Sequence, residues 1–237
     1  MKLHEKQLMR VPEGTSFTRQ QWAAFSLRYI SAWANWRVAY QCWQSQMRGV
    51  PPRDTIVCGW GGGVSFAELT LAKRLGCQAI MACSHPQRLE LLRQAGIDAI
   101  DRREFRNDDF EQQFLDAIAA KTGGRGVSIF IDNLGAPVHR ITLKALARQG
   151  VMTTCGWKLG MRTPIARAIE CLNRHLHVHT HYARYQEGLD AVRYADEHGW
   201  MPQHEQRVWS WDEIPTLFNE YALGNISSYF PIFAVNA

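Results

Sequence analysis

Short apolar runs alternate with segments of helical periodicity through the middle of this chain of 237 residues. Runs typical of buried strands occur at 55–59, 79–83, 98–100, 127–132, 151–155 and 176–182. Helical patterns follow them at 64–75, 86–95, 108–122, 137–148 and 164–173. Because strands that alternate with helices pair in parallel and are covered on both faces, the pattern predicts an α/β fold with a doubly wound, mostly parallel sheet of six strands.

A long helical pattern at 20–48 precedes the first strand and carries an aromatic stripe. The stripe residues recur every seven positions and therefore share one helix face: Trp22, Tyr29, Trp36 and Trp43. We interpret this face as packed into a core or an interface, with a platform for a substrate or quinone as the alternative.

The chain is predicted to divide into three parts. Residues 1–48 form an N-terminal segment, and 49–183 form a Rossmann-like domain. The remainder, 184–237, predicts a helix at 187–198, a strand at 206–209, a helix at 211–221 and a strand at 229–235. We expect this remainder to pack on the N-terminal segment as a small remnant of a second domain.

A glycine cluster lies between the first predicted strand and the first helix after it. It contains Gly59, Gly62 and Gly63, and Val64 follows. A pyrophosphate must approach the backbone without a Cβ in its way, and the N–H groups of the first helical turn then face the anion. The position after a strand and before a helix therefore predicts a dinucleotide site.

The stretch Gly59-Trp-Gly-Gly-Gly-Val64-Ser65, followed by Ala72-Lys73 and Gly76, resembles the cofactor loop of the medium-chain dehydrogenase/reductase superfamily. Its quinone oxidoreductase and enoyl reductase branches are the most similar. Further matching segments follow in order at 84–89, 95–98, 126–135, 146–150 and 155–156. The resemblance covers roughly 20–237 and implies a Rossmann-type cofactor domain.

Two residues of the loop depart from the family pattern. Ser65 stands where the family usually has the last glycine, which allows close packing of helix on strand. Serine is small, so we expect the site to survive. Trp60 is bulkier than the usual residue, and we expect it to narrow the cleft or cover the adenosine side.

The end of the second predicted strand indicates which cofactor would bind. NAD sites usually place a carboxylate there, whereas this chain has Ser84, with Arg88 four residues later. A hydroxyl and a guanidinium would bind a 2′-phosphate through charge-assisted hydrogen bonds. Arg102 stands where relatives often have a tyrosine near that phosphate. The sequence therefore predicts NADPH in preference to NADH, and solvated surface arginines are the alternative.

The nicotinamide end is expected at the carboxyl ends of the fourth and fifth strands, where open α/β sheets bind ligands. The residues there are Asn133, Leu134, Cys155 and Gly156. Ser31 resembles the hydroxyl residue that faces the nicotinamide in the family, and a serine bonded to its own helical turn is the alternative. No catalytic residue is assigned, and His181, Tyr182 and the aromatic helix at 20–48 are the candidates for a proton donor.

Four histidines alternate along the last predicted strand of the sheet, at 175, 177, 179 and 181. Alternation places them on one face, where two could share a metal ion. No Cys, Asp or Glu at suitable spacing joins them, so no metal is predicted. We expect instead a histidine-lined edge at 176–182 through which two copies pair as a homodimer, weakened by protonation below about pH 6.

The resemblance also bears on zinc and on the extent of the fold. Zinc-dependent relatives take their catalytic ligands largely from an N-terminal GroES-like domain and carry a loop of four cysteines. Neither pattern occurs in this sequence, so the resemblance implies a zinc-free reductase branch or a loss of catalysis. It also leads us to expect that most of the GroES-like domain is absent.

Charge and composition disfavour other classes. The net charge is +5, but the basic residues form no stripe, which argues against nucleic-acid binding. No apolar run approaches the roughly 20 residues of a membrane helix, and no signal peptide is apparent. Six cysteines without CxxC pairing indicate reduced thiols and a cytoplasmic protein.

Together these features predict an NADPH-dependent, zinc-independent oxidoreductase that reduces activated alkenes such as quinones, enones or enoyl thioesters. Its partner would be a small-molecule substrate. The alternative is a non-catalytic or partial dinucleotide-binding module that acts with a partner supplying the missing catalytic domain. The sequence leaves open whether the chain is catalytically active.

Overall fold

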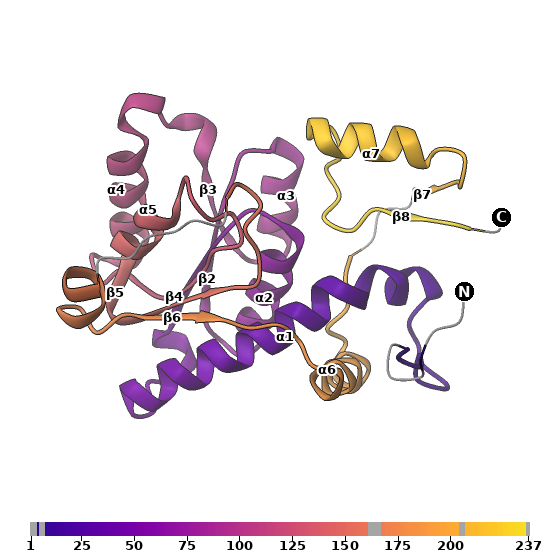
Figure 1. Cartoon of the computed structure of the whole chain (residues 1–237), viewed down its shortest axis with the longest axis horizontal. Coiled ribbons are helices and arrows are strands. Elements are labelled where there is room, and N and C mark those ends of the chain that lie inside the picture. The colour runs from indigo at the N-terminus through magenta and orange to yellow at the C-terminus, as the bar shows by residue number, and fades with distance from the viewer. Residues whose placement is uncertain (1–3, 5–7, 161–166, 204–206, 236–237) are drawn as a thin grey trace.

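The structure is a computed structural model that describes residues 4, 8–160, 167–203 and 207–235. Its central feature is one parallel sheet of six strands, which are β1 Ile56–Trp60, β2 Gln78–Cys83, β3 Asp98–Asp101, β4 Val127–Ile131, β5 Leu146–Thr154 and β6 His177–Thr180. The strand order is β3-β2-β1-β4-β5-β6 (Figure 1). The predicted fold class is confirmed, and the order reverses between β1 and β4, where such sheets bind ligands.

Helices cover both faces of the sheet, as the doubly wound arrangement requires. The helices of the described chain are α1 Arg19–Met47, α2 Gly63–Arg74, α3 Pro86–Gln94, α4 Phe110–Thr122, α5 His139–Ala145, α6 Tyr185–His198 and α7 Ile214–Leu223, of which α7 lies away from the sheet (Figure 1). Alternate residues of β1 enter two separate cores: Val57 packs with α1, α2 and α3, whereas Ile56 and Cys58 pack with α4 and α5. Strand residues are therefore apolar on both sides.

Helix α1 carries the aromatic stripe into the first core. A capping box begins it, with Thr18 Oγ1 accepting a hydrogen bond from the Gln21 N–H at 3.2 Å. All four stripe residues are at most 7% exposed: Trp22, Tyr29, Trp36 and Trp43. The Tyr29 ring lies 4.6 Å from that of Trp200, and the Trp43 indole donates to Thr55 Oγ1 at 3.2 Å. The stripe is a packing face, not a substrate platform.

Two predicted helices differ from the structure. The pattern at 137–148 predicted a helix to residue 148, but α5 ends at Ala145 and β5 begins at once. The β4–β5 register shifts between Val127 and Ile129, and Gln149 takes a positive φ of 64°, so the extra residues of β5 bulge out of the ladder. Of the helix predicted at 164–173, Arg167–Leu172 forms a π-helix, and 161–166 lies outside the described residues.

The C-terminal elements lie beside the beginning of α1, on the opposite side of the molecule from β5 (Figure 1). Helix α6 packs on α1, where the rings of Trp33 and Tyr194 are 4.7 Å apart. Two short parallel strands, β7 Val208–Trp209 and β8 Ile232–Phe233, pair beyond it. The last strand is thus shorter than the predicted 229–235. The division into three parts stays a prediction.

The described part of the chain contains no helix that is both long enough and apolar enough to cross a bilayer. Strand β6 forms one edge of the sheet, so its outer backbone groups are available for pairing with another strand. Dimerisation through this edge stays a prediction.

Candidate functional site

The glycine loop connects β1 to α2, as predicted for Gly59 to Val64. Gly62 is the N-cap of α2 and has φ 152° and ψ 159°, a conformation that residues with a side chain rarely adopt. A Cβ built on Gly62 would meet no atom within 4 Å. Open space therefore lies directly beside the N-terminus of α2, where backbone N–H groups and the helix dipole favour an anion.

The neighbouring small residues are needed for packing. A Cβ on Gly63 would lie 2.8 Å from Arg28 Cδ and 3.0 Å from the Tyr229 carbonyl oxygen. A Cβ on Gly59 would lie 3.4 Å from the Cβ of Ser65, which is 1% exposed. Helix α2 thus crosses β1 closely, and serine at position 65 is compatible with this crossing.

A cavity of about 300 Å³ opens at this loop, at the point where the strand order reverses. Its lining brings together three groups of residues. They are the loop itself (Gly61–Ser65), Asn133 and Leu134 after β4, and the C-terminal residues 221–224 with Tyr229. Two cations, Arg88 and Lys158, complete the lining. A larger hollow of about 470 Å³ lies between α3 and β3 and shares none of these residues.

A buried carboxylate holds the loop after β4. Asp132 Oδ1 accepts hydrogen bonds from the N–H groups of Leu134 and Gly135, each at 3.0 Å, and Oδ2 accepts from Thr142 Oγ1 at 3.0 Å. Burial raises the pKa of the Asp132 carboxyl, although these hydrogen bonds act to lower it. The Trp60 indole donates to Thr142 Oγ1 at 2.7 Å. Trp60 is fully buried in the second core, so the expectation that it narrows the cleft or covers the adenosine side is wrong.

Asn133 joins the loop to α2 and β5. Its Oδ1 accepts from the Cys155 N–H at 2.9 Å, and its Nδ2 donates to Ser65 Oγ at 3.4 Å. Burial raises the pKa of the Cys155 thiol to about 12, so the thiol is protonated at neutral pH. Gly156 lines a smaller cavity of about 120 Å³ beside the ends of β4, β5 and β6.

A second buried acid, Glu68, was not singled out from the sequence. It lies within α2 at 0% exposure, and Oε1 accepts from Asn35 Nδ2 of α1 at 3.2 Å. Burial raises the pKa of Glu68 well above the ordinary value, and the negative charge of its ionised form adds to the raised pKa of Cys155. Glu68 does not line the cavity at the glycine loop.

Cations gather at the carboxyl end of β2. Arg102 Nη2 donates to Ser84 Oγ at 3.2 Å, and its guanidinium lies 5.9 Å from the centre of the Trp60 ring. Burial lowers the pKa of His85, and the positive charges of Arg88 and Arg103 lower it further. The electrostatic environment here favours an anion, as the predicted 2′-phosphate requires.

Arg88 is neither a solvated charge nor directed at Ser84. Its Nε donates to the Ser227 carbonyl oxygen at 2.8 Å, and its Nη2 donates to the Ile226 carbonyl at 2.9 Å. The guanidinium also lies 4.9 Å from the centre of the Tyr229 ring. Arg88 thus fixes the C-terminal segment 226–229 against α3, beside the glycine loop.

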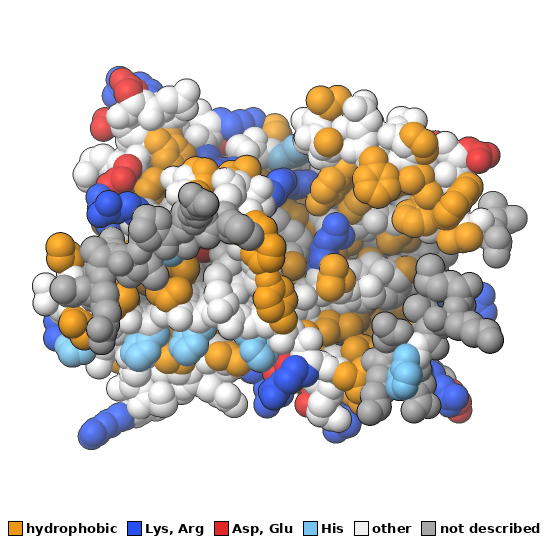
Figure 2. Space-filling view, viewed as in Figure 1, with side chains coloured by type: hydrophobic (Ala, Val, Ile, Leu, Met, Phe, Trp, Pro, Cys, Tyr) orange, Lys and Arg blue, Asp and Glu red, His pale blue; other side chains and the backbone are white. Residues whose placement is uncertain are grey.

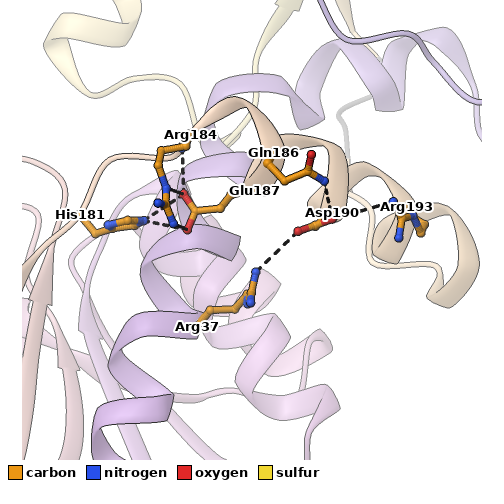
Figure 3. Close-up of polar contacts among 7 residues, drawn as sticks. All are labelled: Arg37, His181, Arg184, Gln186, Glu187, Asp190 and Arg193. Atoms are coloured by element: carbon orange, nitrogen blue, oxygen red, sulfur yellow. Dashed lines mark hydrogen bonds and ion pairs between the residues drawn. The ribbon is translucent and has the colours of Figure 1, made fainter.

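Several site residues considered from the sequence lie outside the cavity lining: Ser31, Gly59, Ser84, Arg102, Cys155, Gly156, His181 and Tyr182. Ser31 is half-buried on α1. Tyr182 is 61% exposed, and His181 Nε2 lies 3.0 Å from Glu187 Oε1 (Figure 3). Lys158 and Tyr229 do line the cavity but were missed. A signal for Lys158 was available in the sequence, because this residue follows 155–157 at the end of β5. No local signal was available for Tyr229, which reaches the cavity from the C-terminal part of the chain.

Glu187 fastens the end of β6 to α6 (Figure 3). Burial alone would raise its pKa, but hydrogen bonds from the Arg184 N–H at 2.9 Å, from the Arg184 guanidinium and from His181 lower it to about 2. Arg37 of α1 reaches Asp190 of α6 at 3.7 Å. This cluster has a structural role, because none of its members lines the cavity.

Only part of the histidine pattern lies on β6. His177 and His179 share one face, with ring centroids 6.2 Å apart and planes 8° apart. His175 lies before the strand with a positive φ of 55°, and His181 follows it and turns to Glu187. The expectation that one strand places all four on one face is therefore wrong.

The chain is similar in sequence to a known family and to parts of much longer proteins. The family model described as zinc-binding dehydrogenase matches residues 63–192. A phenolphthiocerol synthesis polyketide synthase type I from Mycobacterium bovis is 29% identical over 142 residues, which cover 60% of this chain and 6% of that protein. A phthioceranic/hydroxyphthioceranic acid synthase from Mycobacterium tuberculosis is 31% identical over 104 residues, covering 44% and 5%. The chain spans less than a tenth of these curated relatives.

Solved structures share the fold over most of this chain. Escherichia coli quinone oxidoreductase complexed with NADPH has a TM-score of 0.74 at 18% identity, covering 97% of this chain and 68% of that one. The alcohol dehydrogenase of Aeropyrum pernix has a TM-score of 0.70 at 19% identity, covering 90% and 58%.

Proposed function

The chain belongs to the zinc-binding dehydrogenase family, within the medium-chain dehydrogenase/reductase superfamily, and from this premise we propose that it binds NADPH and reduces activated alkenes. Quinones, enones and enoyl thioesters are the substrate classes. The observation that carries the proposal is Gly62, which leaves open space at the N-terminus of α2 beside the cavity.

The residues of the cavity fit a dinucleotide together with Ser84 and Arg102, which lie outside its lining. Gly61 to Val64 would hold the pyrophosphate, because the first N–H groups of α2 have no partner within the helix and a Cβ at Gly62 would fill the required space. Ser84 and Arg102, already in contact, would hold a 2′-phosphate. NADH has no 2′-phosphate, so these two residues favour NADPH.

The bound cofactor supplies a hydride, and the residues of the chain position it and stabilise charge. Asn133 and Leu134 form the wall at the end of β4, and Asp132 fixes their backbone. We assign to Lys158 the stabilisation of negative charge on a substrate oxygen, because its side chain is the cation on the β5 side of the cavity. The proton donor is left unassigned.

The family description implies zinc, but the cavity does not fit a zinc ion. Its lining contains no Cys, His, Asp or Glu within the described part of the chain. Zinc needs such ligands, so we derive no zinc-dependent step at this cavity.

An assay of NADPH oxidation tests the proposed activity. The purified chain is incubated with NADPH and, in turn, a quinone, an enone and an enoyl thioester, and absorbance loss is compared with a reaction that lacks the acceptor. We expect acceptor-dependent oxidation, reduced about 10-fold or more in Lys158→Met, as for loss of a preorganised charge. Lys121→Met, on the surface of α4, is the matched control. NADPH binding without turnover of any acceptor would favour the alternative.

The alternative is a dinucleotide-binding module that works with a separate catalytic partner. It is favoured by large apolar side chains that are exposed on and beside the C-terminal elements: Trp211, Phe218, Leu223, Phe233 and Val235. Figure 2 shows hydrophobic side chains gathered over the region of α7 and β8. Exposed apolar patches of this kind often mark interaction surfaces. The two functions are distinguished by turnover of the isolated chain.

A further inference from the structure

We propose that Cys42, His177 and His179 form a binding site for a Zn²⁺ ion that joins helix α1 to the edge strand β6. One ligand atom from each residue lies within 4.8 Å of the others. Among the described residues, this is the group of Cys, His, Asp and Glu side chains that could hold a metal ion.

The fold itself brings the three ligands together. His177 and His179 are two apart on β6, so their side chains leave the strand on the same face, and their rings are nearly parallel. Helix α1 passes that end of the sheet, and Cys42 comes from its C-terminal half. Figure 2 shows histidine side chains along the surface over β6, so the group is open to solvent on one side.

The contacts around the ligands also favour a cation. His179 Nε2 is buried and has no hydrogen-bond partner among the described residues, an arrangement that costs free energy unless something binds there. Cys42 Sγ accepts a hydrogen bond from Gln46 Nε2 at 3.4 Å. Such an outer contact orients a sulfur ligand and stabilises its negative charge.

The ligand types select the metal. One sulfur and two imidazole nitrogens suit a borderline-soft ion such as Zn²⁺ and do not suit Mg²⁺ or Ca²⁺, which prefer oxygen. Binding replaces the S–H bond of Cys42 with an S–Zn bond and releases that proton to solvent. Both imidazoles bind as neutral rings through a nitrogen lone pair, and water takes the fourth position.

The site is separate from the cavity at the glycine loop, because none of the three ligands lines it. Its effect would be structural. The ion would link α1 to β6, which are distant in the sequence and meet only in the folded chain. A ligand that binds only the folded chain must raise its melting temperature.

Cobalt substitution tests the site directly. The full chain is freed of metal with a chelator, desalted and titrated with Co²⁺ and then with Zn²⁺. We expect saturation at one equivalent, a sulfur-to-cobalt charge-transfer band in the near ultraviolet, loss of that band as Zn²⁺ displaces Co²⁺, and a higher Tm with Zn²⁺. NADPH is absent throughout, so the result does not depend on the proposed oxidoreductase function.

Variants identify the ligands. Cys42→Ser should abolish the charge-transfer band, and His179→Asn should weaken Zn²⁺ binding by about 100-fold or more, since even an outer contact costs 10–100-fold. Cys171→Ser and His175→Asn are matched controls outside the group and should change neither. His177 is exposed, so His177→Asn gives a third ligand variant that does not depend on core packing.

The proposal is overturned by either of two results. One is a wild-type chain that shows no sulfur-to-cobalt band and no rise in Tm with Zn²⁺. The other is binding that survives in folded Cys42→Ser and His177→Asn chains at wild-type affinity, which would assign the ion to other surface histidines. Circular dichroism of each variant confirms that a loss of binding is not a loss of fold.

Discussion

The glycine loop and the edge strand β6 are assembled in opposite ways. At the loop, β1, the turn and the start of α2 are consecutive in the sequence, and Gly62 holds its conformation through local geometry. At β6, the Cys42 thiol that lies near His177 and His179 comes from α1, which is far away in the chain. A local pattern was therefore enough to identify the first region, whereas only the fold reveals the second.

The two regions also differ in what a substitution should disturb, ligand binding or folding. The loop is open at Gly62, so a substitution there should affect a ligand more than the fold. The contacts at the end of β6 hold elements together, so substitutions there should affect folding more than a cofactor. The predictions below test this contrast, beginning with the largest expected effect.

Gly62→Val should weaken NADPH binding by more than about 100-fold, because its side chain fills the space beside α2 and the backbone conformation disfavours it. The chain should stay folded, with a stability cost of about 1–3 kcal/mol for the strained backbone. Calorimetric titration and urea unfolding measure the two effects. Gly124→Val, at φ 75° with nothing within 4 Å, is the control for strain alone. Equal NADPH affinity in both variants would contradict the assignment of the glycine loop as the pyrophosphate site.

Arg102→Ala should cost NADPH binding about 1.5–3 kcal/mol and leave NADH binding nearly unchanged, since the lost hydrogen bonds are to the 2′-phosphate. Arg88→Ala should weaken both cofactors equally, because Arg88 holds the segment 226–229 through backbone carbonyls. Measuring the affinity of each variant for NADPH and for NADH shows which of the two arginines contacts the 2′-phosphate. A loss confined to NADPH in Arg88→Ala would restore Arg88 as the phosphate ligand.

The sequence predicted the sheet, the loop and most elements because their signals are local. Apolar runs and glycine punctuation identify β1, α2 and β2 without knowledge of the rest of the fold. It could not predict that Arg88 binds carbonyls at 226–228, that Trp60 bonds to Thr142, or that Cys42 meets His177. Each of these contacts joins distant positions and depends on how the helices pack.

The boundary of α5 shows a different limit. The pattern at 137–148 is helical, but the backbone at Leu146 pairs with Val127, and the ladder hydrogen bonds of β5 override the local preference. In the same way, the alternating histidines predicted a strand through position 181, whereas β6 ends at Thr180 and the His181 side chain turns to Glu187.

Glu187→Gln should destabilise the chain by about 1–2 kcal/mol at pH 7, because the charged carboxyl accepts hydrogen bonds from Arg184 and His181. The folded pKa of about 2 lies below the ordinary value of about 4.5. This stability is therefore fully present above about pH 4.5 and is lost as pH falls toward 2. Urea unfolding of both chains at pH 7 and pH 3 measures it. A stability difference that does not shrink at pH 3 would contradict the charge argument.

Asp190→Asn should have the smallest effect, below about 0.5 kcal/mol, since exposed ion pairs contribute little. The pair joins Arg37 and Asp190 at 3.7 Å, with 42% and 31% of the side chains exposed. Urea unfolding in low and high salt checks this, and the small effect should decrease further in high salt. Asp190 also accepts a hydrogen bond from Gln186 at 3.2 Å and lies 3.9 Å from Arg193. A loss as large as that of Glu187→Gln would show that these contacts together contribute more than exposed pairs usually do.

The most direct test of the account is a calorimetric titration of the wild-type chain with NADPH and with NADH. If the glycine loop is a dinucleotide site with Ser84 and Arg102 at its phosphate end, one NADPH binds per chain, and more tightly than NADH. Absence of binding by both cofactors to the folded chain would contradict the central claim.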